Sequence, residues 1–139
     1  MNNTIILIPS RMSASRLPGK PLLKINGTSI IQHVYNKAKA TNLGKVYVAT
    51  EDAEIQNEIE KNGGNSIMTS KNHQTGTDRI FEAIEKIKET ENTKYVINLQ
   101  GDEPQISTDD IINLDKSVRK LNSKIGTLGT DIKDKKIFN

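Results

Sequence analysis

Short apolar runs alternate along this chain with amphipathic segments of helical period. The runs at residues 4–8 and Tyr95–Leu99 are continuous, which is typical of buried parallel strands. The intervening segments repeat their apolar residues at three and four positions and predict helices. We find no hairpin signal between these elements, so the pattern predicts an α/β fold with a doubly wound, mostly parallel sheet. The predicted strands are residues 4–8, 46–50, 66–69, 95–99 and 126–132, with helices starting at Thr28 or Ser29, at Asp52, at Asp78 (to residue 90) and at Ser107.

Charge is divided unevenly along the chain. Residues 1–50 carry seven Lys or Arg side chains and no Asp or Glu, whereas the remaining residues hold 13 basic and 17 acidic side chains. A basic first third followed by an acidic remainder argues against a uniformly basic nucleic-acid-binding surface. We therefore expect a localised anion site and no nucleic-acid partner.

The 139 residues suit one domain of ordinary size. No apolar run approaches the roughly 20 residues that span a bilayer, and the first residues lack the features of a secretory signal. We therefore expect a cytoplasmic protein without membrane insertion. The sequence contains no cysteine, which excludes disulfides, thiolate metal sites and cysteine nucleophiles. His33 and His73 have no carboxylate cluster nearby in the sequence, so we do not expect a zinc site.

The segment after the first predicted strand combines cations, hydroxyls and prolines over residues 9–22. Ligands of open α/β sheets bind beyond the carboxyl ends of the strands, where this segment lies. Arg and Lys offer charge-assisted donors to phosphate, and prolines restrict the backbone that carries them. The segment matches neither of the common glycine-rich phosphate motifs, and an irregular solvated loop is the alternative. The candidate polyphosphate ligands here are Arg11, Ser13, Ser15, Arg16 and Lys20.

The segment after the fourth predicted strand offers a candidate metal ligand. Asp102 follows Gly101 just beyond the apolar run. Mg²⁺ keeps most of its waters and commonly takes one or two carboxylates, so Asp102 is suited to hold an ion that bridges phosphate oxygens. The alternative is that Asp102 or Glu103 closes a turn before Pro104.

A third candidate segment precedes the predicted helix at Asp78. Thr75, Gly76 and Thr77 offer hydroxyls and free N–H groups that can hold a base edge, a sugar or a phosphate. Arg79 follows, and Arg is scarce here: three of the four Arg fall in candidate segments. Its planar set of donors recognises phosphates and bases in a way that Lys cannot. The alternative is Thr77 as an ordinary N-cap with Arg79 on a solvated face.

Four strings of the sequence share their order and spacing with a known family. They are Ile-Pro-Ser-Arg at 8–11, Ser-Arg-Leu-Pro-Gly-Lys-Pro-Leu at 15–22, Met-Thr-Ser at 68–70 with His73 and Thr-Gly-Thr-Asp-Arg at 75–79, and Gln-Gly-Asp-Glu-Pro at 100–104. From about residue 4 to residue 128 the chain closely resembles the 3-deoxy-manno-octulosonate cytidylyltransferases, or CMP-KDO synthetases. The Arg-x-x-x-Ser-Arg-Leu-Pro-Gly-Lys pattern alone would indicate the wider group of sugar nucleotidyltransferases, and the later strings narrow it.

The resemblance implies a Rossmann-like sheet of the nucleotide-diphospho-sugar transferase type. It implies transfer of CMP from CTP to 3-deoxy-manno-octulosonate (KDO), with release of pyrophosphate, for lipopolysaccharide biosynthesis. Lys20, Arg11 and Asp102 are implied to be catalytic, Asp102 through bound Mg²⁺, and full-length members are implied to be homodimers. The implied CTP ligands are Arg11, Ser13, Ser15, Arg16, Lys20, Thr75, Gly76, Thr77, Arg79 and Gln100.

The chain also departs from the family. Ser15 and Thr75 replace the usual Thr and Ser but keep a hydroxyl, whereas Gly129 and Asp131 replace the usual Ala and Pro. Members continue beyond residue 139 into the acceptor pocket, a second Mg²⁺-binding Asp and the dimer interface. We therefore expect residues 1–139 to be a single incomplete domain, from a truncated or interrupted gene, that binds CTP and Mg²⁺ weakly and has little or no transferase activity alone. Two alternatives stay open: a nucleotidyltransferase with another acceptor, such as sialic acid or an isoprenoid precursor, or a non-catalytic remnant.

Overall fold

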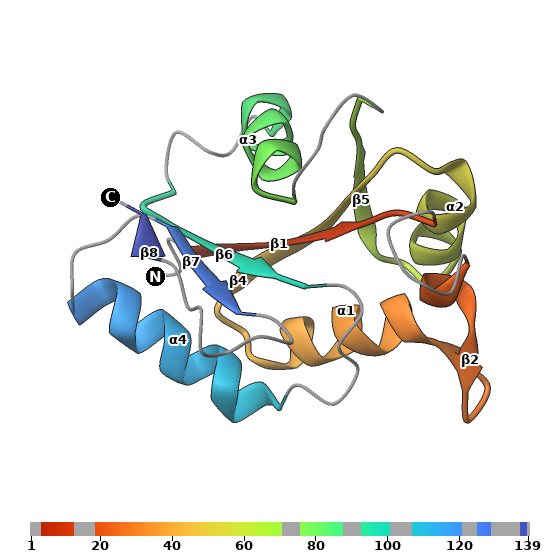
Figure 1. Cartoon of the computed structure of the whole chain (residues 1–139). Coiled ribbons are helices and arrows are strands. Elements are labelled where there is room, and N and C mark those ends of the chain that lie inside the picture. Colours follow the sequence, from red (N-terminus) through yellow and green to blue (C-terminus); the bar gives the residue numbers. More distant parts are fainter. Residues whose placement is uncertain are drawn as a thin grey trace.

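The computed structural model describes residues 4–12, 19–70, 76–87, 93–100, 107–120, 125–128 and 137–138. Strands and helices alternate through most of these residues, as the apolar pattern predicts (Figure 1). In chain order the elements are β1 (Thr4–Ser10), the 3₁₀ helix η1 (Lys20–Leu22), β2 (Lys24–Ile25), β3 (Thr28–Ser29), α1 (Ile30–Ala40), β4 (Gly44–Thr50), α2 (Ala53–Lys61), β5 (Asn65–Met68), α3 (Gly76–Lys86), β6 (Tyr95–Leu99), α4 (Thr108–Lys120), β7 (Ile125–Leu128) and β8 (Ile137–Phe138).

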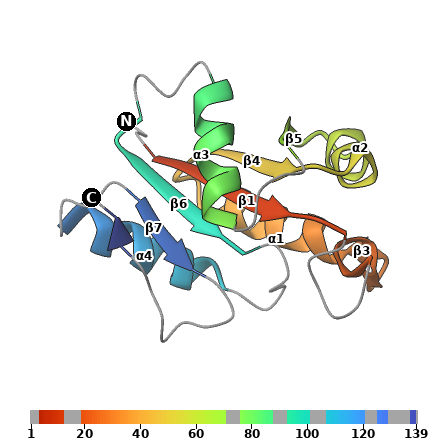
Figure 2. The same ribbon diagram turned by 45° about the horizontal axis from the view of Figure 1, so that its top comes forward.

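Six of the described strands form one sheet in the order β5-β4-β1-β6-β7-β8. β1 lies between β4 and β6, with Ile6 opposite both Val46 and Ile97, and both pairings are parallel (Figure 2). β4 with β5 and β6 with β7 are also parallel, and β8 runs antiparallel to β7. The predicted doubly wound, mostly parallel sheet is therefore confirmed.

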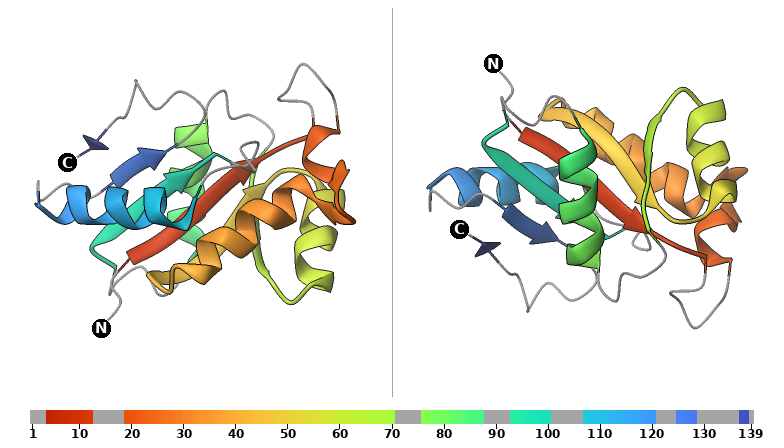
Figure 3. Two further views of the ribbon diagram at one scale, coloured as in Figure 1. Left: turned by 90° about the horizontal axis from the view of Figure 1, so that it is seen from below. Right: turned by 90° about the horizontal axis from the view of Figure 1, so that it is seen from above.

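The helices cover both faces of this sheet. Ile6 and Ile8 of β1 belong to a core cluster with residues of α1, α2 and α4, whereas Ile5 and Leu7 belong to a second cluster with residues of α3. Figure 3 shows α1 and α4 across one face and α3 across the other. Successive side chains of a strand point to opposite faces, so consecutive residues inside a strand that is covered on both faces are mostly apolar. All seven residues of β1 are accordingly buried.

One feature of the fold differs from the prediction. A short hairpin joins η1 to α1: β2 pairs antiparallel with β3, with Lys24 opposite Ser29. Asn26 and Gly27 form its turn with φ values of 55° and 82°. Two successive residues with positive φ are what a tight hairpin turn of this hand requires, and Asn-Gly is the sequence that favours it. Our expectation that no hairpin signal exists was therefore wrong.

The boundaries of the elements refine the prediction. Ser29, not Thr28, caps α1, because its Oγ accepts a hydrogen bond from the Gln32 N–H at 3.2 Å. α3 ends at Lys86 rather than at residue 90. β7 covers the start of the predicted fifth strand, whose residues 129–132 lie outside the described residues. Among the helices that the structure describes, none has the length and apolar character to cross a membrane.

Candidate nucleotide-binding site

The carboxyl ends of the parallel strands bring the predicted site segments to one edge of the sheet. β1 ends at Ser10 beside Thr50 of β4, and β6 follows on the other side of β1. Gln100, a predicted CTP ligand, directly follows β6 and is half-buried. This edge of the sheet is where open α/β sheets bind ligands.

The predicted polyphosphate loop has a closed base. The Gly19 N–H donates to the Met12 carbonyl at 2.9 Å, which joins the two ends of the loop. Gly19 has φ 81°, a left-handed conformation that glycine adopts without the steric cost of a side chain. The six residues between them, including the candidates Ser13, Ser15 and Arg16, lie outside the described residues.

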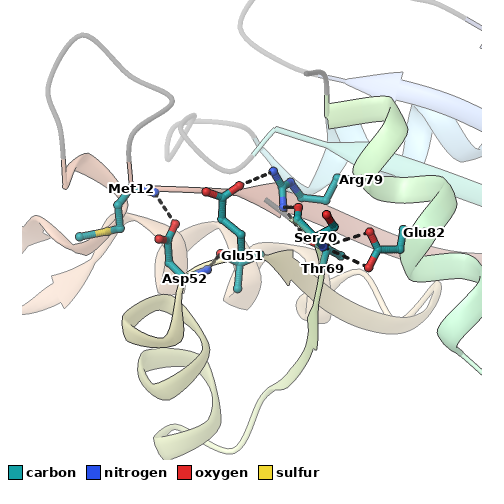
Figure 4. Close-up of polar contacts among 8 residues, drawn as sticks. Met12, Glu51, Asp52, Thr69, Ser70, Arg79 and Glu82 are labelled. Carbon is teal, nitrogen blue, oxygen red and sulfur yellow. Dashed lines mark hydrogen bonds and ion pairs between the residues drawn. The ribbon is translucent and has the colours of Figure 1, made fainter. Parts of the chain in front are cut away.

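A carboxylate that follows the neighbouring strand β4 holds this base in place. The Met12 N–H donates to Asp52 Oδ2 at 2.8 Å (Figure 4). Asp52 stands at the N-cap position of α2, yet its side chain forms no capping hydrogen bond with its own helix. The backbone at Asp52 still begins α2, because its carbonyl accepts the Gln56 N–H at 3.1 Å. The Asp52 side chain therefore bonds the loop that follows β1 (residues 12–19, the β1 loop) and not its own helix.

Two predicted phosphate ligands flank the closed base. Arg11 lies just before Met12 and Lys20 just after Gly19, and both side chains are half-buried. Within the part of the chain that the structure describes, no carboxylate forms an ion pair with either of them. Lys20 is the first residue of η1, and Pro21 follows it. Proline fixes one backbone dihedral, so Lys20 projects from a constrained turn. Arg11 and Lys20 therefore extend from backbone that hydrogen bonds and a proline constrain, which suits the binding of a polyphosphate.

Arg79 is held by contacts inside the protein. Its side chain is 3% exposed, and Nη2 forms an ion pair with Glu51 Oε1 at 2.9 Å. Nη1 donates to Thr69 Oγ1 and, at 3.3 Å, to the Ser70 carbonyl. The alternative of a solvated Arg79 is therefore wrong. α3 begins at Gly76, so Thr77 is a helical residue rather than the N-cap. Direct contact of Arg79 with CTP stays a prediction.

The same edge holds a second link between β5 and α3. The Ser70 N–H donates to both carboxylate oxygens of Glu82, at 3.0 and 3.1 Å. Lys86 pairs with Glu82 at 2.9 Å and donates to the Met68 carbonyl at 2.6 Å. These bonds hold the end of β5 and the residue Ser70 beyond it against the middle and the last turn of α3. Glu51, Asp52 and Glu82 were not among the predicted site residues, because their partners are backbone atoms or a side chain far away in sequence.

The predicted metal ligand cannot be placed. Asp102 and its neighbours at residues 101–106 lie outside the described residues, as does Thr75. Within the described ranges, no three His, Cys, Asp or Glu side chains come together in a way that could hold a metal ion.

Comparison with known proteins gives a consistent result. The family model described as "Cytidylyltransferase" matches residues 5–139. A 3-deoxy-manno-octulosonate cytidylyltransferase of Afipia carboxidovorans is 46% identical over 132 residues, covering 95% of this chain and 53% of the relative. An 8-amino-3,8-dideoxy-manno-octulosonate cytidylyltransferase of Shewanella pealeana is also 46% identical, over 99% of this chain and 57% of the relative.

Solved structures agree with these relatives. A CMP:2-keto-3-deoxy-manno-octonic acid synthetase solved with CTP is 42% identical and superposes with a TM-score of 0.78, covering 86% of this chain and 48% of that one. The chain spans about half the length of the curated relatives it matches. The family match runs through nearly the whole chain, and the sheet and its helices have the fold of a solved member. The chain therefore belongs to the cytidylyltransferase family.

Proposed function

We propose that this chain is the CTP-binding, N-terminal part of an enzyme that transfers CMP from CTP to KDO. One observation carries the proposal: Arg11 and Lys20 flank a loop whose base is closed by the Gly19 to Met12 hydrogen bond. A pair of cations on a constrained backbone at the carboxyl edge of a parallel sheet suits a nucleoside triphosphate. The similarity to a synthetase solved with CTP supports cytidine as the base.

The proposed reaction requires residues that stabilise negative charge on the transferred phosphoryl group. The anomeric hydroxyl oxygen of KDO forms a bond to the α-phosphorus, the bond from that phosphorus to the bridging oxygen breaks, and pyrophosphate leaves while the hydroxyl proton is lost. Negative charge grows on the phosphoryl oxygens in the transition state. Arg11 and Lys20, together with Arg16, would stabilise that charge without first having to reorganise. Ser13 and Ser15, with backbone N–H groups of the loop, would donate to other phosphate oxygens.

The cytidine would lie beside Gln100 and residues 75–79. Gln100 has both an amide donor and a carbonyl acceptor, which is what recognition of a base edge needs. Thr75, Gly76, Thr77 and Arg79 contribute hydroxyls, a helix N-terminus and a guanidinium. Mg²⁺ is proposed at Asp102, where it would neutralise phosphate charge. The protein would work in the cytoplasm, and its complete relatives would be homodimers.

The acceptor has two candidates. KDO is the named sugar of several relatives, whereas the Shewanella pealeana relative is named for the 8-amino sugar and is equally identical. Pyrophosphate release measured with CTP, Mg²⁺ and either sugar separates them in a complete protein. For the 139-residue chain alone we expect little or no turnover with either sugar, because catalysis by positioning also needs the acceptor pocket. Turnover close to that of complete relatives would contradict this expectation.

Binding of CTP tests the core of the proposal independently of turnover. Calorimetric titration of the 139-residue chain with CTP and Mg²⁺ should show weak, saturable binding. Lys20→Ala should weaken it by about tenfold, as loss of one charge-assisted contact implies. Lys24→Ala is the matched control, because Lys24 is exposed on β2 and removes the same charge four residues away. An equal loss in both variants would indicate net charge rather than a site.

A further inference from the structure

Two consecutive carboxylates follow β4, and they reach in different directions (Figure 4). Asp52 accepts the Met12 N–H at the base of the β1 loop, 40 positions away in sequence. Glu51 pairs with Arg79 of α3, 28 positions away. The backbone at Asp52 is extended, with φ −107° and ψ 124°. Neighbouring side chains on extended backbone point to opposite sides, so one dipeptide can contact two separate segments.

The charge of Asp52 does not explain its place. A carboxylate beside Arg11 and Lys20 lowers the positive potential that a triphosphate would meet. Asp52 also forms no capping bond with α2. The observed contact of its side chain is the hydrogen bond from the Met12 N–H, and the carbonyl of the same residue accepts the Gly19 N–H. Asp52 therefore holds Met12, the residue whose carbonyl closes the loop between the two cations.

Glu51 holds the start of α3, as Asp52 holds the β1 loop. Its ion pair with Arg79 neutralises a guanidinium that is 3% exposed. Arg79 in turn bonds Thr69 and Ser70 at the end of β5, so the first turn of α3 is joined to the ends of both β4 and β5. That first turn contains Gly76 and Thr77, which belong to the proposed cytidine segment.

We propose that Glu51 and Asp52 together are a positioning element that sets the spacing between the triphosphate loop and the cytidine segment. In this proposal neither residue touches the nucleotide: Asp52 acts through Met12 and Glu51 acts through Arg79. The proposal deepens the function proposed above and rests on it. Binding energy then depends on a hydrogen-bond acceptor at position 52 rather than on a negative charge there, because preorganisation of the loop lowers the entropy lost on binding.

Substitutions at position 52 separate the acceptor from the charge. Asp52→Asn keeps an oxygen that can accept the Met12 N–H, and Asp52→Ala removes it. We expect Asp52→Ala to raise the Kd for CTP and for inorganic tripolyphosphate by about tenfold. Asp52→Asn should bind both probes as tightly as the unsubstituted chain, or more tightly. Glu54→Ala is the matched control, because Glu54 is an exposed acid on the first turn of the same helix. Equal affinities for Asp52→Ala and Asp52→Asn would overturn the proposal.

The link from Glu51 to Arg79, called the Glu51 arm, should affect the binding of the two probes differently. Glu51→Gln keeps an acceptor for Arg79, and Glu51→Ala does not. Because this arm reaches only the cytidine segment, Glu51→Ala should weaken CTP and leave tripolyphosphate binding within about twofold. A general loss of folding would weaken both probes, so this split distinguishes positioning from stability. Equal weakening of both probes by Glu51→Ala, in a chain with an unchanged circular dichroism spectrum, would refute the Glu51 arm.

Amide exchange tests the proposal without any ligand. In ¹⁵N NMR, the Met12 and Gly19 amides should be protected in the unsubstituted chain and in Asp52→Asn, and should exchange faster in Asp52→Ala. Retained protection in Asp52→Ala would overturn the Asp52 arm. If the unsubstituted chain binds neither CTP nor tripolyphosphate, the proposed function fails and the positioning role that rests on it fails too. If the amide exchange rates still depend on the acceptor at position 52 in that case, they show only that Asp52 helps to close the loop.

Discussion

Replacing Arg79 by Met should destabilise the fold strongly. The guanidinium is 3% exposed and Glu51 is 12% exposed, so the substitution leaves a largely buried carboxylate without its cation. The ion pair lost here is a charge-assisted bond of about 1.5–3 kcal/mol, and the bonds to Thr69 and Ser70 contribute about 1 kcal/mol each. Hydration of Glu51 and of the Ser70 carbonyl in the variant offsets part of this lost stabilising free energy. We expect a net loss of about 3 kcal/mol, within the range for breaking a buried pair.

Urea unfolding followed by far-UV circular dichroism at pH 7 measures this loss, which should correspond to a fall of about 10 °C in Tm for a domain of this size. Arg79→Lys is the control, because it keeps a cation but not the planar donor set, and should lose about half as much. The double variant Arg79→Met with Glu51→Met should lose less than the sum of the single variants, because the two residues interact directly. A loss below about 1 kcal/mol for Arg79→Met, or strict additivity with Glu51→Met, would refute the reasoning.

Three other substitutions test separate parts of the structure by the same unfolding assay. Gly44→Ala should cost about 3 kcal/mol, since its Cβ would lie 1.7 Å from the Thr4 carbonyl oxygen, and a loss under about 1 kcal/mol would contradict this. Asp115→Ala should cost about 2–3 kcal/mol because this buried carboxylate accepts the Thr4 hydroxyl at 2.9 Å, while Asp115→Asn should cost less. A hydrogen bond from Ser29 holds the pKa of Glu58 below its ordinary value of 4.5, so its stabilisation is present above that value and is lost as pH falls through the folded-state pKa. The stability difference between the unsubstituted chain and Glu58→Gln should therefore shrink as the pH falls below 4.5, and a constant difference would count against it.

Most of the sheet could be predicted because its signal is local. β1 and β6 are covered on both faces, which demands continuous apolar sequence, and that sequence is visible without any structure. The hairpin at Asn26 and Gly27 also has a local signal in its Asn-Gly turn, but its two strands of two residues each are too short to show an alternating pattern. β8 has two residues, which are too few for a strand pattern to be recognised in the sequence.

Only some residues of the candidate site could likewise be identified from the sequence. The cations Arg11 and Lys20 were identifiable because they follow a predicted strand, and the structure places them at either side of a closed loop base. The supporting residues were not identifiable. Asp52 reads as an ordinary helix cap, and only the folded chain shows that it bonds Met12 instead. Arg79 was correctly singled out as unusual, but residue type alone cannot show that Glu51 takes its charge.

The central claim is that the β1 loop binds the triphosphate of CTP. Chemical-shift mapping by ¹⁵N NMR, with CTP and then with tripolyphosphate added to the 139-residue chain, tests it most directly. We predict that both ligands shift the amides of Arg11, Met12, Gly19 and Lys20, and that CTP alone also shifts those of Gln100 and α3. Perturbations absent from the β1 loop, or confined to another surface while CTP binds, would contradict the account.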